Sequence, residues 1–142
     1  MGNIILWSTG DTFRQIIKIS GEGDPCSSIG LWNDLIIGGY GSGHLRVYSA
    51  TTGKMCVEAS AHAKWITAID VAKSTGLILS ASEDTFARVW KLSSGSNVKM
   101  ELVHSETIAD LQLQGAKFIS EDGRAFACTG YDSNEIHFFT KA

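Results

Sequence analysis

Apolar and polar residues alternate along much of the chain, most clearly in the stretch 61–91. The run Trp65 to Val71 (WITAIDV) has apolar side chains at nearly every second position, a period that predicts a half-buried β-strand. A Ser-Thr-Gly turn leads into a second predicted strand at 77–82, and Glu83-Asp84 turns the chain into a third at 86–90. No segment of the stretch has the 3.6-residue period of a helix. The pattern therefore predicts an antiparallel meander of short strands.

The aromatic residue that ends the third strand recurs at a regular interval. Trp7, Tyr48 and Trp90 lie 41 and 42 residues apart, and the run 135–139 (EIHFF) supplies a fourth member after a longer gap. Between one aromatic and the next meander lies room for a fourth, outer strand, which we place at 13–19, 54–59 and 98–103. Four strands in a period of about 40 to 45 residues are typical of a β-propeller blade.

These spacings divide the chain into parts of four blades. Residues 1–20 supply the third and fourth strands of a first blade, 21–60 and 61–104 each form a complete blade, and 105–142 form an incomplete last one. Thirteen strands do not close a ring, and an incomplete stack leaves an apolar face open at each end. We therefore expect an all-β fold, a partial propeller of about three blades. It is either part of a longer propeller or a ring that several copies complete.

The stretch 61–91 resembles a WD repeat, with Ala61-His62 in place of Gly-His and Trp90-Lys91 in place of Trp-Asp. The resemblance covers nearly the whole chain. Its more specific segments are 38–43 (GGYGSG), 48–53 (YSATTG), 82–86 (SEDTF) and 129–132 (TGYD).

The resemblance implies a buried hydrogen-bond network that joins the loop before the first strand to the next two strands. It assigns the histidine of that loop to His62, the hydroxyl of the second strand to Ser80, the turn carboxylate to Asp84 and the aromatic of the third strand to Trp90. Each of these groups costs about 1–3 kcal/mol if it is buried unpaired, so mutual pairing favours one packing of the blade.

The other blades match this network less well. The blade 21–60 has Gly38, Ser42 and Tyr48 at the corresponding places, so its charged pair is missing. In the last blade the resemblance implies a pair between His104 and Asp132. Cys128 stands there in the serine position, and Phe138 or Phe139 in the aromatic one.

Ser80, His62 and Asp84 are also the three residue types of a hydrolase triad. No glycine-flanked nucleophile elbow surrounds Ser80, so the sequence favours the structural role. A solvent-exposed Ser80 would instead favour a hydrolase.

Composition and charge limit the classes of partner and ligand that the chain is expected to bind. The formal net charge is −3 and the twelve basic residues are scattered, which argues against a nucleic-acid partner. Three widely spaced cysteines predict neither a disulfide framework nor a zinc site, and they suit a reducing, cytoplasmic compartment. The four histidines have no metal-like spacing, so we expect no metal and no cofactor. The apolar run Ile4 to Trp7 is too short to span a membrane.

WD-repeat proteins contact partners through one face of the propeller, with residues just after the loop histidine and just before the turn aspartate. The resemblance carries this role onto Trp65, Thr67, Glu83, Thr107 and Tyr131, and also onto Gly41 and the loop near Pro25. Trp65 and Tyr131 are the strongest candidates because aromatic anchors dominate interfaces. Asp70 and Asp110 are expected on first strands, as solvent-facing or turn-bonding residues.

These observations predict a non-catalytic WD-repeat scaffold that binds protein partners. The resemblance places such proteins in signalling and membrane-traffic assemblies, in the cytoplasm or on vesicles through their partners. One alternative is a self-assembly module that forms homo-oligomers through open blade edges. A Ser80 and His62 hydrolase is the second alternative.

Overall fold

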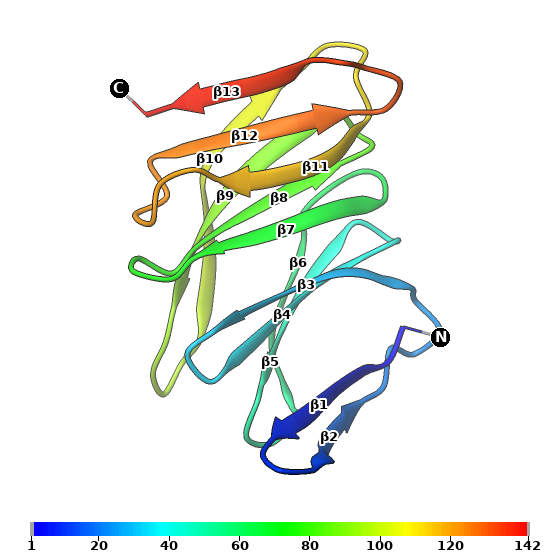
Figure 1. Ribbon diagram of the computed structural model, residues 1–142, viewed down its shortest axis with the longest axis vertical. Coiled ribbons are helices and arrows are strands. Elements are labelled where there is room, and N and C mark those ends of the chain that lie inside the picture. Colours follow the sequence, from blue (N-terminus) through cyan, green and yellow to red (C-terminus); the bar gives the residue numbers. More distant parts are fainter. Residues whose placement is uncertain (1, 142) are drawn as a thin grey trace.

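The computed structural model describes residues 2–141, and within them it contains thirteen β-strands. These strands form four antiparallel sheets in strict chain order (Figure 1). The first sheet consists of β1 (Ile4–Thr9) and β2 (Phe13–Ile19). The second consists of β3 (Cys26–Trp32), β4 (Leu35–Tyr40), β5 (His44–Ser49) and β6 (Met55–Ser60). The third consists of β7 (Ile66–Ala72), β8 (Leu77–Ser82), β9 (Phe86–Ser93) and β10 (Lys99–Thr107). The fourth consists of β11 (Leu113–Phe118), β12 (Ala125–Gly130) and β13 (Ile136–Thr140). The expected all-β meander is confirmed.

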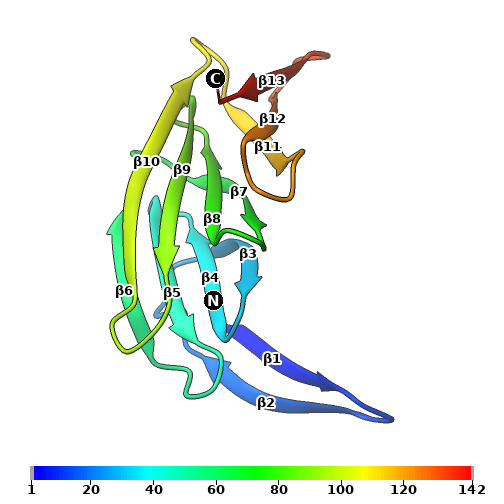
Figure 2. The ribbon, with the colours of Figure 1, turned by 90° about the vertical axis from the view of Figure 1, so that its left-hand side faces the viewer.

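The sheets stack face to face. The first strands β3, β7 and β11 lie beside one another, and the outer strands β6 and β10 form the opposite side (Figure 2). Stacking buries the second strands β4 and β8 on both faces, so β4 is buried at every position and β8 at all but one. This burial explains why β4 and β8 read as continuous apolar or small-residue runs, whereas the outer strand β6 alternates.

Three apolar clusters fill the spaces between neighbouring sheets. One contains Ile4, Ile19, Ile36 and Tyr48, between the first and second sheets. The largest side chains of the next, between the two four-stranded sheets, include Ile37, Leu45, Ile78 and Trp90. The last lies between the third and fourth sheets and contains Leu79, Leu113, Phe118 and Phe126. Each sheet is therefore held mainly by its neighbours, as in a solenoid or propeller.

The outer strand β10 is longer than the sequence predicts. It continues past 103 to Thr107 and pairs its last residues with Phe86 to Val89 of β9, after a register shift between Leu102 and His104. An outer strand tolerates exposed polar side chains, so the polar run 104–107 does not end it. The last sheet therefore begins after residue 107, and the predicted boundary at 104/105 is wrong.

No helix within residues 2–141 is long and apolar enough to cross a bilayer.

Candidate functional site

A chain of hydrogen bonds joins four side chains of the third sheet in the order Asp84, His62, Ser80 and Trp90. The His62 side chain is fully buried, with Nε2 2.8 Å from Ser80 Oγ and Nδ1 3.0 Å from Asp84 Oδ1. The indole Nε1–H of Trp90 donates to Ser80 Oγ over 3.0 Å. The structure thus brings together the four residues that the resemblance assigned to this network.

Burial sets the protonation of the network. It lowers the pKa of His62 below its usual value, with the nearby Asp84 carboxylate opposing the shift. A neutral imidazole has one N–H, so Nδ1–H donates to Asp84 and Nε2 accepts from Ser80. Burial would raise the pKa of Asp84, but backbone N–H donors from Ala63 and Phe86, together with His62, hold it below its usual range.

Ser80 has the partners of a catalytic serine but not its accessibility. Its side chain is 0% exposed, and the Trp90 ring, itself buried, donates a hydrogen bond to the same oxygen that would attack a substrate. A nucleophile needs room for the reacting carbon about 3 Å from its oxygen. The geometry therefore supports the structural role of Ser80 and not the hydrolase alternative.

In the second sheet, different residues pair the buried polar groups at the corresponding place. Tyr48 Oη lies 2.8 Å from Tyr40 Oη, and burial raises the pKa of Tyr40. The carboxylate comes from the loop before β3, where Asp24 accepts a hydrogen bond from Ser42 Oγ at 2.5 Å and pairs with Arg46 at 3.2 Å. The resemblance places the carboxylate in the turn, where this sheet has Ser42, so it did not point to Asp24.

The predicted pair between His104 and Asp132 is wrong. His104 lies within β10, its side chain is half exposed, and its Nε2 is 2.9 Å from Glu106 Oε1. Strand register shows why: His62 lies four residues before β7, and Ala109 lies four residues before β11. The last sheet therefore has no histidine at this place. Cys128, in the serine position, is buried, which raises its thiol pKa to about 12.

Six connections lie at one edge of the stack, and we call them the rim. They are the loops before β3, β7 and β11 (20–25, 61–65 and 108–112) and the turns 41–43, 83–85 and 131–135. A backbone hydrogen bond ties each loop to the turn of its own sheet: Gly41 N–H to Pro25 O at 2.9 Å, Glu83 N–H to Trp65 O at 3.1 Å, and Tyr131 N–H to Gln112 O at 2.8 Å. The rim therefore presents a repeated pair of adjacent residues.

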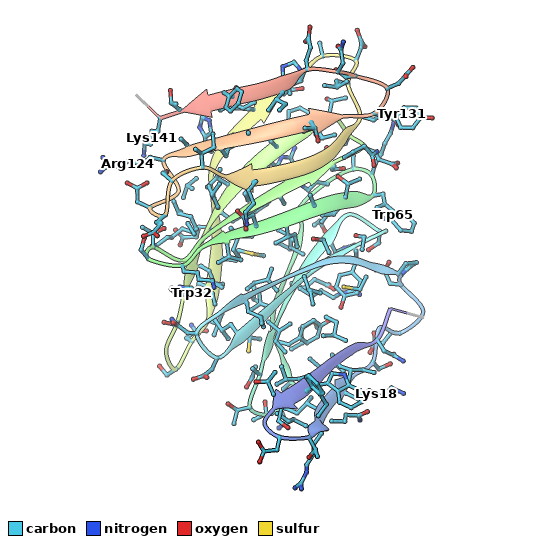
Figure 3. The ribbon with its side chains drawn as sticks, in the orientation of Figure 1. Lys18, Trp32, Trp65, Arg124, Tyr131 and Lys141 are labelled. Atoms are coloured by element: carbon cyan, nitrogen blue, oxygen red, sulfur yellow. The ribbon has the colours of Figure 1, made fainter. Side chains whose placement is uncertain are left out.

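The rim exposes two large aromatic side chains. Trp65 is 40% exposed and Tyr131 is 69% exposed, and both point away from the sheets at the same edge (Figure 3). The Trp65 ring packs over Gly41 of the preceding sheet, where an added Cβ would stand 2.9 Å from the ring. Glu83 lies half-buried beside Trp65. Gly41 thus supports Trp65 and offers no side chain of its own.

Two other predicted contact residues have different surroundings. Thr67 points between sheets, and its hydroxyl donates to Leu113 O at 2.8 Å, so it joins the third sheet to the fourth. Thr107 ends β10 and lies 3.0 Å from the Thr85 hydroxyl, outside the loop that was expected to hold it. Gln112, which the resemblance did not single out, occupies the place of Trp65 in the last sheet.

The two aspartates that were expected on first strands, Asp70 and Asp110, have surroundings that differ from that expectation. Asp70 does lie on β7, but its side chain is only 14% exposed and accepts a hydrogen bond from Phe118 N–H of the next sheet at 2.8 Å. Asp110 precedes β11 in an exposed loop. Among residues 2–141, no three His, Cys, Asp or Glu side chains are placed to hold a metal ion.

Comparisons with known proteins agree with this architecture. A family model described as WDR54 matches residues 1–142. WD repeat-containing protein 54 of Homo sapiens is 44% identical over 142 residues, which cover 98% of this chain and 42% of the human protein. WD repeat domain 54 of Rattus norvegicus is 44% identical over 139 residues, covering 95% of this chain and 41% of the rat protein. The chain spans about two fifths of the length of these relatives.

A solved structure shows the same fold. The β-propeller domain of Cps50 (Swd1) from Myceliophteria thermophila matches with a TM-score of 0.72 and 19% sequence identity, over 82% of this chain and 38% of that one. The expected partial β-propeller is confirmed.

Proposed function

We propose that this chain, which belongs to the WDR54 family, is a non-catalytic scaffold that binds protein partners through its rim. The observation that carries the proposal is the repeated pairing of a loop residue with a turn residue, which holds Trp65 and Tyr131 at one edge with much of their surface exposed. Exposed aromatic side chains on a rigid framework are typical anchors of protein interfaces.

Rigidity of the rim supports the same proposal. Trp65 is the last residue before β7, and the network beneath it joins His62 and Ala63 of its own loop to Asp84 of the adjacent turn. A binding side chain held in one position loses little conformational freedom when a partner docks. The buried network thus acts on binding indirectly, by holding the loop and the turn together.

The setting that we propose is a signalling or membrane-traffic assembly in the cytoplasm or on vesicles, reached through partner proteins. General use of WD-repeat proteins in such assemblies supports this setting. Fractionation of cells that express the tagged chain tests it: Trp65→Ala should shift any vesicle-associated fraction toward the cytosol, and association that Trp65→Ala leaves unchanged would contradict recruitment through the rim.

Site-specific photocrosslinking tests the binding function itself. A photoreactive phenylalanine analogue at Tyr131 should form discrete protein adducts in cells, whereas the same analogue at Lys54, in the turn between β5 and β6 at the opposite edge, should not. Adducts at Tyr131 should also disappear in Trp65→Ala. Equal crosslinking from both positions, or none from Tyr131, would contradict the proposal.

Self-assembly is a second candidate, favoured by the apolar outer faces of the end sheets. Trp7 is 49% exposed and Phe13 75% on the first sheet, and Ile136 is 58% exposed and Phe138 67% on the last. Light scattering over a range of concentrations tests this candidate. A discrete oligomer that Phe138→Ser dissociates would support assembly through these faces, and a monomer at every concentration would exclude it.

A further inference from the structure

We propose that the rim recognises a basic segment of its partner, an exposed peptide rich in lysine and arginine. This inference rests on the proposed binding function and names the chemistry of the partner. The two exposed aromatic rings of the rim, Trp65 and Tyr131, are surrounded by negatively charged side chains.

The rim is strongly acidic, whereas the opposite edge is nearly neutral. The six rim connections carry seven carboxylates and one lysine, Lys64. The six connections at the other edge, residues 10–12, 33–34, 50–54, 73–76, 94–98 and 119–124, carry four carboxylates and three basic residues. The net charge of −3 is therefore unevenly distributed, with the negative charge collected where the aromatic rings are exposed.

Most of the rim carboxylates are not used within the protein. Asp84 is committed to His62, and Asp24 to Ser42 and Arg46. Of the remaining five, Glu135 Oε2 lies 3.7 Å from His137 Nε2. The other four make no salt bridge within residues 2–141; they are Glu22, Glu83, Asp110 and Asp132. They are spread over the rim, and no three of them converge as a metal site would require. An extended partner with several separate positive charges matches such a distribution.

The aromatic rings favour the same partner. Glu83 is joined to Trp65 through its backbone, and Asp132 directly follows Tyr131. A lysine or arginine side chain can place its charge over the electron-rich face of a ring while it pairs with the adjacent carboxylate. A negatively charged partner, such as nucleic acid or an acidic membrane surface, would be repelled at this edge.

Fluorescence anisotropy with labelled peptides of one length tests the inference. Each of the three peptides has serine and glycine between copies of one test residue, which is arginine in the first, glutamate in the second and leucine in the third. We expect the arginine peptide alone to bind, and its affinity to fall between about 50 and 300 mM salt because both partners are exposed to solvent. Glu83→Gln with Asp132→Asn should weaken binding about tenfold, roughly threefold for each charge removed.

A matched double variant separates a local effect from total charge. Asp34→Asn with Glu121→Gln removes two exposed charges at the opposite edge, and it should leave affinity for the arginine peptide within about twofold. Trp65→Ala should weaken that affinity about tenfold. Equal losses in the two double variants would overturn the inference, because the peptide would then respond only to net charge.

The remaining outcomes distinguish this inference from the binding function. Binding of the leucine or glutamate peptide that requires Trp65 would overturn the basic-partner inference and leave the scaffold function intact. Failure of all three peptides to bind would also overturn the inference, and photocrosslinking at Tyr131 would decide the scaffold function separately.

Discussion

Replacing Asp84 with alanine should destabilise the third sheet far more than its position in a surface turn suggests. The Asp84 carboxylate accepts hydrogen bonds from His62 Nδ1–H, Ala63 N–H and Phe86 N–H. Alanine leaves the fully buried imidazole N–H without a partner, which costs about 1–3 kcal/mol. The two backbone groups lie nearer to solvent and lose charge-assisted bonds that water partly replaces. We therefore expect a loss of about 3 kcal/mol in the free energy of unfolding.

Urea unfolding followed by circular dichroism measures this loss. For a domain of this size, about 3 kcal/mol corresponds to a fall of roughly 10 °C in the melting temperature. The slope of the unfolding free energy against urea should stay unchanged, because the variant buries the same surface. Asp34→Ala is the matched control, since Asp34 is an exposed turn aspartate whose side chain makes no hydrogen bond within residues 2–141. Equal midpoints for Asp84→Ala and Asp34→Ala would refute the assignment of Asp84 to the network.

Three further predictions concern the same contacts. The pKa of His62 in the folded protein lies below its usual 6.5, so His62 of the unfolded chain takes up a proton at a higher pH than His62 of the folded chain. The contribution of His62 to folding stability should therefore be full above about pH 6.5 and fall as the pH drops toward the folded pKa. The lowered pKa of Asp84 adds a further loss below about pH 3.8. A urea midpoint that is the same at about pH 7.5 and pH 5, or that falls equally in His62→Gln, would be inconsistent with this. Gly41→Val should displace the Trp65 ring and shift one resonance in the fluorine NMR spectrum of protein labelled with 5-fluorotryptophan. Gly10→Val, at a position with open space, is the control. An unchanged spectrum for Gly41→Val would show that the Trp65 ring does not pack on Gly41. Asp70→Ala should lower the free energy of unfolding by about 1–2 kcal/mol, because it leaves Phe118 N–H unpaired between sheets. The Lys117 side chain is 77% exposed, so Lys117→Ala should lower the free energy of unfolding by less than about 0.5 kcal/mol. Similar urea midpoints for the two variants would assign Asp70 to the surface ion pair alone.

The fold was largely predictable because strand patterns are local. Alternation, turn residues and the recurring Trp7, Tyr48 and Trp90 specify strand length and period without reference to the rest of the chain. Residues 2–141 form thirteen strands in sheets of two, four, four and three, in agreement with those spacings. The error at β10 arose where local signals are weakest, since an exposed outer strand needs no apolar alternation to continue.

The site was predictable only in the sheet that keeps the usual residue types. His62, Ser80, Asp84 and Trp90 stand where the resemblance places the network residues, and their buried polar groups pair with one another. In the last sheet His104 was expected in the loop before the first strand, because the sequence does not show that the outer strand β10 continues to Thr107. Pairing of Leu113 with Gly130 places Ala109 there instead.

The sequence by itself determined the strands, their order, the period of the sheets and the chemistry of one buried network, because each depends on residues close together in the chain. Tertiary structure alone decided which polar groups cross from one sheet to the next. Thr67 donates to Leu113 O, and Asp70 accepts from Phe118 N–H. Within the second sheet, tertiary structure also brought Asp24 of the loop before β3 to Ser42, in place of a turn carboxylate. Thr67 and Asp70 join residues more than forty positions apart, and only the stacking of the sheets brings those atoms within hydrogen-bonding distance.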